Sequence, residues 1–95
     1  MDRRYRVVAT RAFERQARHL HKRSPDAYDA LLHALELLET DPFNITGRAD
    51  IRKLVHVPSG EGQFRLRIGD YRLRYDVSGT DVVLHSIRPR STSYR

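Results

Sequence analysis

Apolar side chains near the start of the chain alternate with polar ones and then change to a helical period. The stretch from Arg4 to Ala9 alternates, which is typical of a strand. Thr10 is a favourable N-cap for the helix that follows, because its hydroxyl can accept a hydrogen bond from a backbone N–H of the first turn. The apolar positions of that helix share one face and are Phe13, Ala17 and Leu20.

A second helix is expected directly after the first. Ser24 and Pro25 are typical of an N-cap and a first helical position, so the first helix should end before them. The apolar stripe of the second helix is broad and consists of Tyr28, Leu31, Leu32, Leu35 and Leu38. We expect this helix to stop near Asp41-Pro42, since the residue before a proline avoids the helical conformation.

The second half of the chain predicts a loop and then an antiparallel meander. Pro42, Asn44 and Gly47 make residues 41–50 a loop. Strands are expected at about residues 51–57, 63–68, 71–78 and 81–88. Residues 58–62, 69–70 and 78–80 carry the turn signals between them.

These elements predict an α+β fold, in which an N-terminal strand and a two-helix hairpin pack on one face of a small antiparallel sheet. The helices have no other apolar surface to cover, so the second face of the sheet should be open. Alternation directs one set of side chains towards the helices, namely Phe64, Leu66, Ile68, Tyr71, Leu73, Tyr75 and Val77. With 95 residues there is room for one domain, which we expect to be residues 1–95.

Arginines alternate with the apolar residues on two of these strands. If residues 69–70 form a two-residue turn, Arg67 faces Arg72 and Arg65 faces Arg74. All four arginines then lie in one patch on the open face. Like charges directly opposite each other destabilise a sheet, so such a patch costs stability unless an anion binds to it.

The alternative interpretation is that these arginines form an ordinary solvated face. The positive charge would be partly offset by nearby acidic residues, namely Glu61, Asp70 and Asp76. The nearest of them in register, Asp76, lies beyond the patch. The composition favours phosphate, because 16 of the basic residues are arginines and only two are lysines. A planar guanidinium can hold phosphate with two parallel hydrogen bonds. At a net charge of +6, nucleic acid is the expected partner.

Composition also excludes several kinds of chemistry. The chain has no cysteine, so disulfides and thiol catalysis are excluded, and a zinc site would need histidines and carboxylates only. No apolar run approaches the roughly 20 residues that cross a bilayer, and the N-terminal stretch does not resemble a signal-peptide core. We expect a cytoplasmic protein that needs no metal ion or cofactor and does not contact a membrane.

The order of elements and the arginine-rich strands resemble the RelE/ParE superfamily, the toxins of type II toxin–antitoxin systems. Lys53-Leu54 is similar to the Lys-Leu that opens the second strand in that family, and residues 90–95 are similar to its C-terminal ending. The family pattern Arg-x-Gly-Asp-Tyr-Arg-x-x-Tyr is matched by Arg67, Gly69, Asp70, Tyr71, Arg72 and Tyr75. The resemblance covers essentially the whole chain.

The resemblance implies an activity and the residues that carry it. Members of the RelE branch cut mRNA in the ribosomal A site without a metal ion and leave a 2′,3′-cyclic phosphate. By resemblance, Arg65 and Arg72 stabilise the phosphate, and Arg88 or Arg90 matches the arginine near the C-terminus. Tyr94 matches the terminal tyrosine that stacks on the substrate or activates it. Further contacts to nucleic acid are expected from Lys53, Arg67 and Arg74.

The groups that transfer protons are left open, because the chain departs from the family pattern there. Pro89 stands where a histidine often precedes the matching arginine, and Gln63 stands where some members have a second lysine. Arginine is a poor general acid or base, whereas imidazole titrates near neutrality. His56 shares the open face only if the inferred register holds, and His85 has the parity of a helix-facing residue. Both are more readily interpreted as structural or surface histidines.

Three functions are consistent with this resemblance. The first is a ribosome-dependent mRNA endonuclease that inhibits translation, and the ending with Tyr94 favours it. The second is a ParE-like toxin that inhibits DNA gyrase, and the third is an inactive member that regulates DNA only in complex with an antitoxin. Each implies a cognate antitoxin that wraps acidic, amphipathic segments over the basic surface. Operator DNA would be bound only through that complex.

Overall fold

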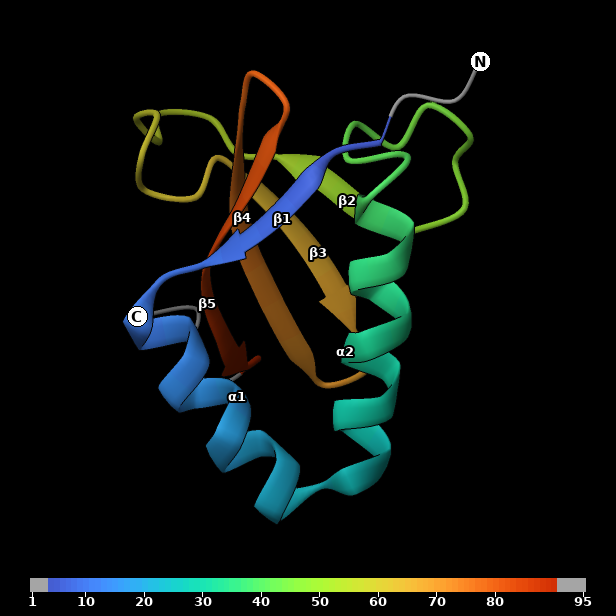
Figure 1. The fold of residues 1–95 in the computed structure, drawn as a ribbon, viewed down its shortest axis with the longest axis vertical. Coiled ribbons are helices and arrows are strands. Elements are labelled where there is room, and N and C mark those ends of the chain that lie inside the picture. The colour runs from blue at the N-terminus through green and yellow to red at the C-terminus, as the bar shows by residue number, and fades with distance from the viewer. Residues whose placement is uncertain (1–3, 91–95) are drawn as a thin grey trace.

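The computed structural model describes residues 4–90, which form five strands and two helices (Figure 1). Strand β1 (Arg6–Ala9) is followed by helices α1 (Arg11–Arg23) and α2 (Pro25–Leu38). The remaining strands are β2 (Ile51–Lys53), β3 (Phe64–Ile68), β4 (Tyr71–Ser78) and β5 (Asp81–Pro89). The predicted order of strand, two helices and meander is therefore confirmed.

The strands form one sheet in the order β1-β5-β4-β3-β2. Strands β2 to β5 make the expected antiparallel meander, while β1 pairs in parallel with β5, where Val7 lies opposite Val82. A parallel pair needs a long crossover connection, and the helical hairpin begins that connection. The sheet is consequently mixed, a feature that the alternation pattern did not predict.

Both helices begin where the sequence predicted. The hydroxyl of Thr10 accepts a hydrogen bond from the backbone N–H of Phe13 at 3.1 Å. Ser24 ends α1, since its N–H donates to the carbonyl of Leu20 at 2.8 Å, and its hydroxyl accepts from the N–H of Ala27 at 3.3 Å at the start of α2. One residue thus fixes the tight connection between the two helices.

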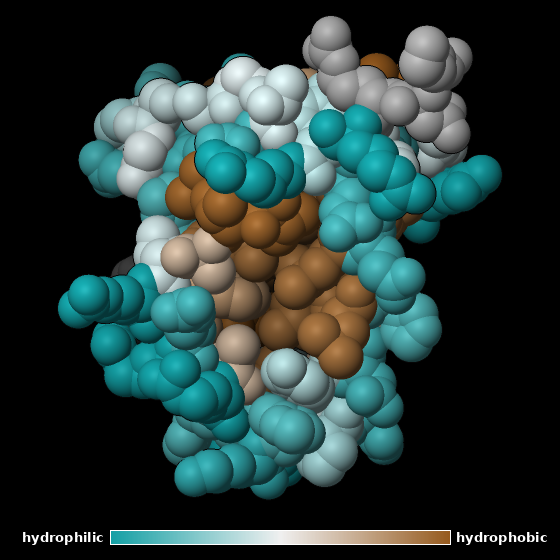
Figure 2. Space-filling model, viewed as in Figure 1, coloured by the Kyte–Doolittle hydropathy of each residue, from teal (hydrophilic) through white to brown (hydrophobic). Residues whose placement is uncertain are grey.

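The helices cover one face of the sheet and leave the other face open (Figure 1). The buried core contains five of the seven predicted inward residues of β3 and β4, together with apolar residues from both helices and β5, while Tyr71 and Val77 are half-buried and pack against it. Its members are Phe13, Leu20, Leu31, Leu38, Phe64, Leu66, Ile68, Leu73, Tyr75, Val82, Leu84 and Ile87. The helices do not close completely over the sheet, and apolar surface is visible between them, framed by hydrophilic side chains (Figure 2).

Tyr75 is a polar group in the centre of this core. Its side chain is fully buried and stacks on the ring of Phe64 at 5.4 Å between centroids. The hydroxyl donates to the carbonyl of Pro42 at 2.7 Å, which ties the loop after α2 to the sheet. Burial, followed by the nearby charge of Asp41, raises the pKa of the hydroxyl well above its usual range.

The strand expected at residues 51–57 is wrong in its second half, since β2 ends at Lys53. The alternating valines at 55 and 57 suggested a longer strand, but Val55 is exposed and His56 adopts a left-handed backbone with φ of 63°. Further along this segment, the backbone N–H groups of residues 60, 62 and 63 donate to the side chain of Asp76. In the described part of the chain, neither helix is long and apolar enough to cross a membrane.

Candidate functional site

The turn between β3 and β4 sets the register of the arginine-rich strands. Gly69 adopts a φ of 56°, a conformation that glycine reaches without strain, and residues 69–70 form a two-residue turn. Arg67 then lies opposite Arg72, and Arg65 lies opposite Arg74. The predicted register is therefore confirmed, and the four side chains share the face that the helices leave open.

The register extends this set to six arginines across four strands. Arg52 of β2 lies opposite Arg65, and Arg88 of β5 lies opposite Arg72. We refer to the six as the arginine face, which consists of Arg52, Arg65, Arg67, Arg72, Arg74 and Arg88. The sequence analysis missed Arg52, although its position next to the inward-facing Ile51 would have indicated it.

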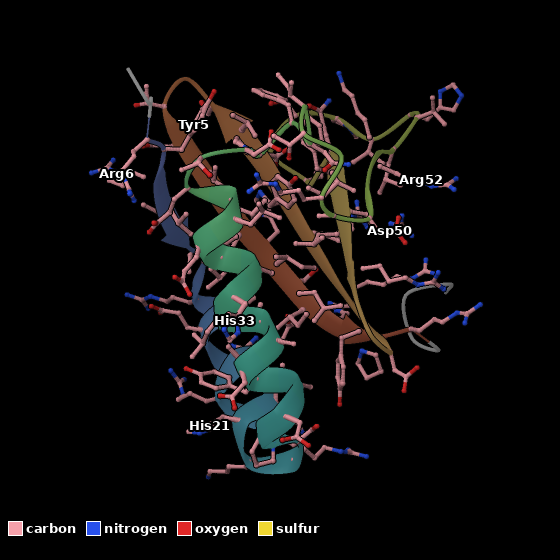
Figure 3. The ribbon with its side chains drawn as sticks, turned by 90° about the vertical axis from the view of Figure 1, so that its right-hand side faces the viewer. Tyr5, Arg6, His21, His33, Asp50 and Arg52 are labelled. Atoms are coloured by element: carbon pink, nitrogen blue, oxygen red, sulfur yellow. The ribbon has the colours of Figure 1, made fainter. Side chains whose placement is uncertain are left out.

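Asp50 gives the arginine face an acidic partner that the sequence analysis did not find. It lies on the side of the sheet away from α2, as does Arg52 (Figure 3). Its carboxylate is 3.0 Å from Nη2 of Arg65 and 3.8 Å from Nη1 of Arg67. The expectation that Asp76 is the nearest acid was wrong, because Asp50 precedes β2 and its carbonyl accepts from the N–H of Arg67 at 3.0 Å.

Arg65 is correspondingly less accessible than a solvated surface residue. Only 8% of the residue is exposed, and its Nε is buried with no hydrogen-bond partner among the described residues. A buried guanidinium is strongly destabilising without a counter-charge, so Asp50 stabilises the side chain. Arg65 is held in place, whereas Arg67 and Arg88 are exposed.

Arg74 holds the loop that precedes β3. Its Nε donates to the carbonyl of Gly62 at 2.9 Å, and its Nη2 donates to the carbonyl of Glu61 at 3.0 Å. Gly62 has a φ of 83°, and a Cβ added there would lie 3.0 Å from Cβ of Arg74. Both the backbone conformation and the close approach require glycine at this position.

Asp76, two residues after Arg74 on β4, holds the same loop. Its carboxylate accepts from the N–H groups of Gly60 at 3.1 Å, Gly62 at 2.8 Å and Gln63 at 2.9 Å. Burial favours the neutral acid and on its own would raise the pKa of Asp76. The hydrogen bonds from Gln63 and Gly62, together with the contact to His85, outweigh burial, so the pKa lies below its usual range.

His85 meets this buried carboxylate, contrary to the prediction from its parity. A bulge in β5 pairs Arg74 with Ser86 but Tyr75 with Leu84, so His85 is an extra residue that faces no partner on β4. The bulge turns its side chain to the open face, where Nε2 lies 2.7 Å from Oδ2 of Asp76.

The contact between His85 and Asp76 is an ion-pair contact when the imidazole is protonated. Nε2 is buried and its N–H is not aligned with the oxygen as in a regular hydrogen bond. The ring as a whole keeps 23% of its side-chain surface exposed.

The structure separates the other predicted site residues. Lys53 lies opposite Phe64, which places it on the helix-covered side and away from the arginine face. His56 is exposed in the loop after β2, not in a strand. Arg90 lies at the hairpin end, where its N–H donates to the carbonyl of Asp70 at 2.7 Å. Tyr94 lies outside the described residues.

A groove separates α1 from the ends of β4 and β5. Its volume is about 500 Å³. Apolar side chains line much of the groove, and three arginines stand among them. The lining residues are Arg15, Gln16, His19, Leu20, Arg23, Tyr71, Ile87, Arg88 and Pro89. Because Arg88 also belongs to the arginine face, the groove and that face are neighbours.

The described residues contain no group of three or more histidine and carboxylate side chains that could hold a metal ion. The site brings guanidinium groups together with an imidazole and carboxylates. Guanidinium groups on a fixed sheet can bind phosphate and stabilise negative charge that develops on it.

Comparison with solved structures shows that the chain has the fold of toxins from toxin–antitoxin complexes. The structure is similar to the archaeal RelE–RelB complex from Pyrococcus horikoshii OT3, with 26% identity, a TM-score of 0.70 and coverage of 90% of this chain and 94% of that one. It is similar to the RelBE2 toxin–antitoxin complex from Mycobacterium tuberculosis, with 27% identity, a TM-score of 0.67 and coverage of 92% and 99%. YafQ from E. coli shares the fold at 14% identity, with a TM-score of 0.75 and coverage of 96% and 99%.

The family is shown by the sequence itself. Residues 4–94 match the model of the ParE toxin of type II toxin–antitoxin systems. A search of curated proteins finds no significant match. The chain therefore belongs to the ParE toxin family, within the RelE/ParE superfamily that its motif resembles.

Proposed function

We propose that this toxin inhibits translation by cutting mRNA on the ribosome. The observation that carries the proposal is the arginine face, which lies in register on the open side of the sheet beside the contact between His85 and Asp76. Cleavage to a cyclic phosphate needs charge stabilisation at a phosphorane and two proton transfers. The site contains residue types suited to each of these tasks.

Phosphate binding falls mainly to the three arginines nearest the hairpin turn. The middle one is Arg72 on β4, which lies opposite Arg67 on β3 and opposite Arg88 on β5. Arg65 and Arg74 support this row, since the first is held by Asp50 and the second holds the loop before β3. Arg72 is the residue on which we place the largest share of charge stabilisation.

Proton transfer falls to His85, with Tyr94 as the second group. Asp76 contacts the imidazole at Nε2, while 23% of the side-chain surface of His85 stays exposed. A carboxylate in contact with a histidine holds the ring in one orientation. His85 can thus act as the acid or base that arginine cannot supply.

A cognate antitoxin is the expected protein partner, and the related RelE structures are complexes with RelB. The groove beside α1 supports this proposal, because apolar side chains such as Leu20 and Tyr71 are framed there by Arg15, Arg23 and Arg88. Such a surface suits an amphipathic segment with acidic side chains along its edges. An antitoxin in this groove would also reach Arg88 of the arginine face.

Gyrase inhibition is the second candidate, because the matching family model is that of the ParE toxin. Induced expression separates the two activities. The nuclease proposal expects translation to stop and mRNA to be cut within ribosome-bound messages. Arg72→Ala should relieve toxicity, whereas Arg4→Ala, which removes an exposed charge paired with Glu39, should leave it unchanged.

Intact messages together with inhibited DNA supercoiling would instead establish gyrase as the target. Circular dichroism and a thermal melt of each variant show whether a loss of toxicity reflects unfolding. If expression of the folded wild-type protein leaves both translation and supercoiling intact, both toxin activities are excluded. The antitoxin is tested separately by co-purification with the protein encoded by an adjacent reading frame.

A further inference from the structure

The outward surface of α1 carries a straight row of positive charges. The row consists of four basic side chains, which at about 100° per residue fall within an arc of about 60° around the helix axis. All four are exposed, and they are Arg11, Arg15, Arg18 and Lys22. We call this row the α1 ridge. It was part of the basic N-terminal block in the sequence, and the proposed function uses only Arg15 of it, at the edge of the groove.

The contacts of α1 establish which way the ridge faces. Phe13 and Leu20 are buried against the sheet. His21 stacks on Tyr28 of α2 at 4.2 Å between ring centroids, so α2 occupies one flank of the helix. The groove occupies the other flank, where His19 contributes to its lining. The ridge therefore faces solvent, directly away from the core.

The ridge is not balanced by acidic residues. Within the described part of the chain, none of its four side chains forms an ion pair. Glu14 is the one acidic residue of α1 and lies on the α2 flank. Like charges three or four residues apart on a helix repel each other, so the row costs stability. Such a cost is expected where the charges are needed to meet an anionic partner.

The ridge and the arginine face lie on opposite sides of the molecule. The helices cover one face of the sheet, and the arginine face is on the other (Figure 1). With a rise of about 1.5 Å per residue, the ridge is about 16 Å long. Over that length a nucleic-acid strand presents about five phosphates, at about 3.4 Å of helix axis per phosphate.

We propose that the α1 ridge is a second nucleic-acid site, which binds the phosphate backbone of an RNA helix while the arginine face holds the substrate strand. In the setting of the proposed function, that helix is structured RNA next to the message. The ridge recognises charge and shape, and not sequence, since its four members are all cationic side chains suited to phosphate contacts. The protein would then contact two RNA segments at once, the RNA helix through the ridge and the substrate strand through the arginine face.

The test measures binding of the folded protein to a fluorescent RNA duplex at several salt concentrations. The variant Arg11→Gln/Arg18→Gln/Lys22→Gln removes three ridge charges and leaves every groove residue in place. The matched control Arg4→Gln/Arg6→Gln/Arg48→Gln removes the same charge from exposed positions elsewhere. We expect the ridge variant to lower the magnitude of the salt slope by about 2 to 3, and the control to lower it by less than about 1.

Equal slopes for the two variants would overturn the proposal, since binding would then follow net charge alone. A ridge effect on a DNA duplex but not on the RNA duplex would also overturn it. If the ridge variant binds RNA normally but loses affinity for the co-purified antitoxin, the ridge is a protein interface. Circular dichroism of both variants checks that the helices remain folded.

Ribosome binding separates this proposal from the nuclease proposal. We expect the ridge variant to leave ribosomes at lower salt than the control in co-sedimentation, while retaining Arg72 and His85 for cleavage of bound message. If the wild-type protein cuts no message yet the ridge variant still loses affinity for the RNA duplex, the nuclease proposal fails and the ridge stands. If the wild-type protein cuts message but the ridge variant binds both the RNA duplex and ribosomes as the control does, the ridge proposal fails and the nuclease proposal stands.

Discussion

His85 and Asp76 meet at 2.7 Å because β5 carries one residue more than β4 at this point. Counted back from the buried Ile87 in a regular strand, the parity of His85 would direct its imidazole to the side of the helices. The bulge instead places the ring against a carboxylate whose other hydrogen bonds come from the loop before β3. A single irregularity thus brings a titratable group to a face that otherwise consists of arginines.

His85→Gln should reduce cleavage of ribosome-bound mRNA by about 100-fold or more, the usual range for loss of a general acid or base. His33→Gln, on the exposed surface of α2, is the matched control. A His85→Gln variant that cuts mRNA at the wild-type rate would exclude the proton-transfer role.

Asp76→Asn should destabilise the fold at neutral pH by about 1.5 to 3 kcal/mol, because hydrogen bonds to a charged group are lost. The pKa of Asp76 is lower in the folded protein than its ordinary value of 3.8. Its contribution to stability is therefore present above that ordinary value and lost as the pH falls through the lower, folded value. Urea unfolding at a series of pH values measures this dependence.

The Asp76→Asn variant should lack that acid-dependent component below about pH 4. Asp29→Asn, on the exposed side of α2, retains Asp76 and should keep the wild-type dependence. Parallel curves for wild type and Asp76→Asn across the acidic range would contradict the assigned role of this carboxylate.

Asp50→Asn should strengthen binding of RNA at low salt. The carboxylate of Asp50 competes with phosphate for Arg65 and Arg67, so its removal frees positive charge. The slope of log affinity against log salt should become steeper by about 1. Asp81→Asn, which frees Arg6 away from the arginine face, controls for the change in net charge. Equal affinities for the two variants would contradict competition at Asp50.

Tyr75→Phe should lower the free energy of unfolding by about 1 to 3 kcal/mol, because the buried carbonyl of Pro42 loses its donor. For a domain of this size, each kcal/mol lowers the melting temperature by about 4 to 8 °C. Tyr28→Phe is the control, since it keeps the ring that stacks on His21. A melting temperature equal to that of the wild type would show that the hydroxyl contributes no net stability.

The sequence predicted those features that depend on local signals. Ser24 and Pro25 placed the break between the helices, and Gly69 with its neighbour placed the hairpin turn, from which the pairs of facing arginines follow. These signals act over a few residues, so a pattern in the sequence is enough to identify them.

Features that depend on contacts between distant segments were not predicted. The bulge at His85 follows from how β5 pairs with β4, and a strict alternation cannot reveal it. The same holds for Asp50, which reaches Arg65 from outside the strand, and for the early end of β2. The roles of Arg72, Arg88 and Tyr94 in catalysis stay predictions from the family resemblance.

The pairing of β1 with β5 has a consequence for how the chain folds during its own synthesis. Arg6 and Asp81 are 75 positions apart, and β5 fills the place between β1 and β4. Until β5 has emerged, β1 and α1 lack the strand on which they pack, the arginine face lacks Arg88, and Asp76 lacks its contact with His85. Chains are made from the N-terminus, and long-range pairs form last. The complete site can therefore assemble only after β5 has left the ribosome.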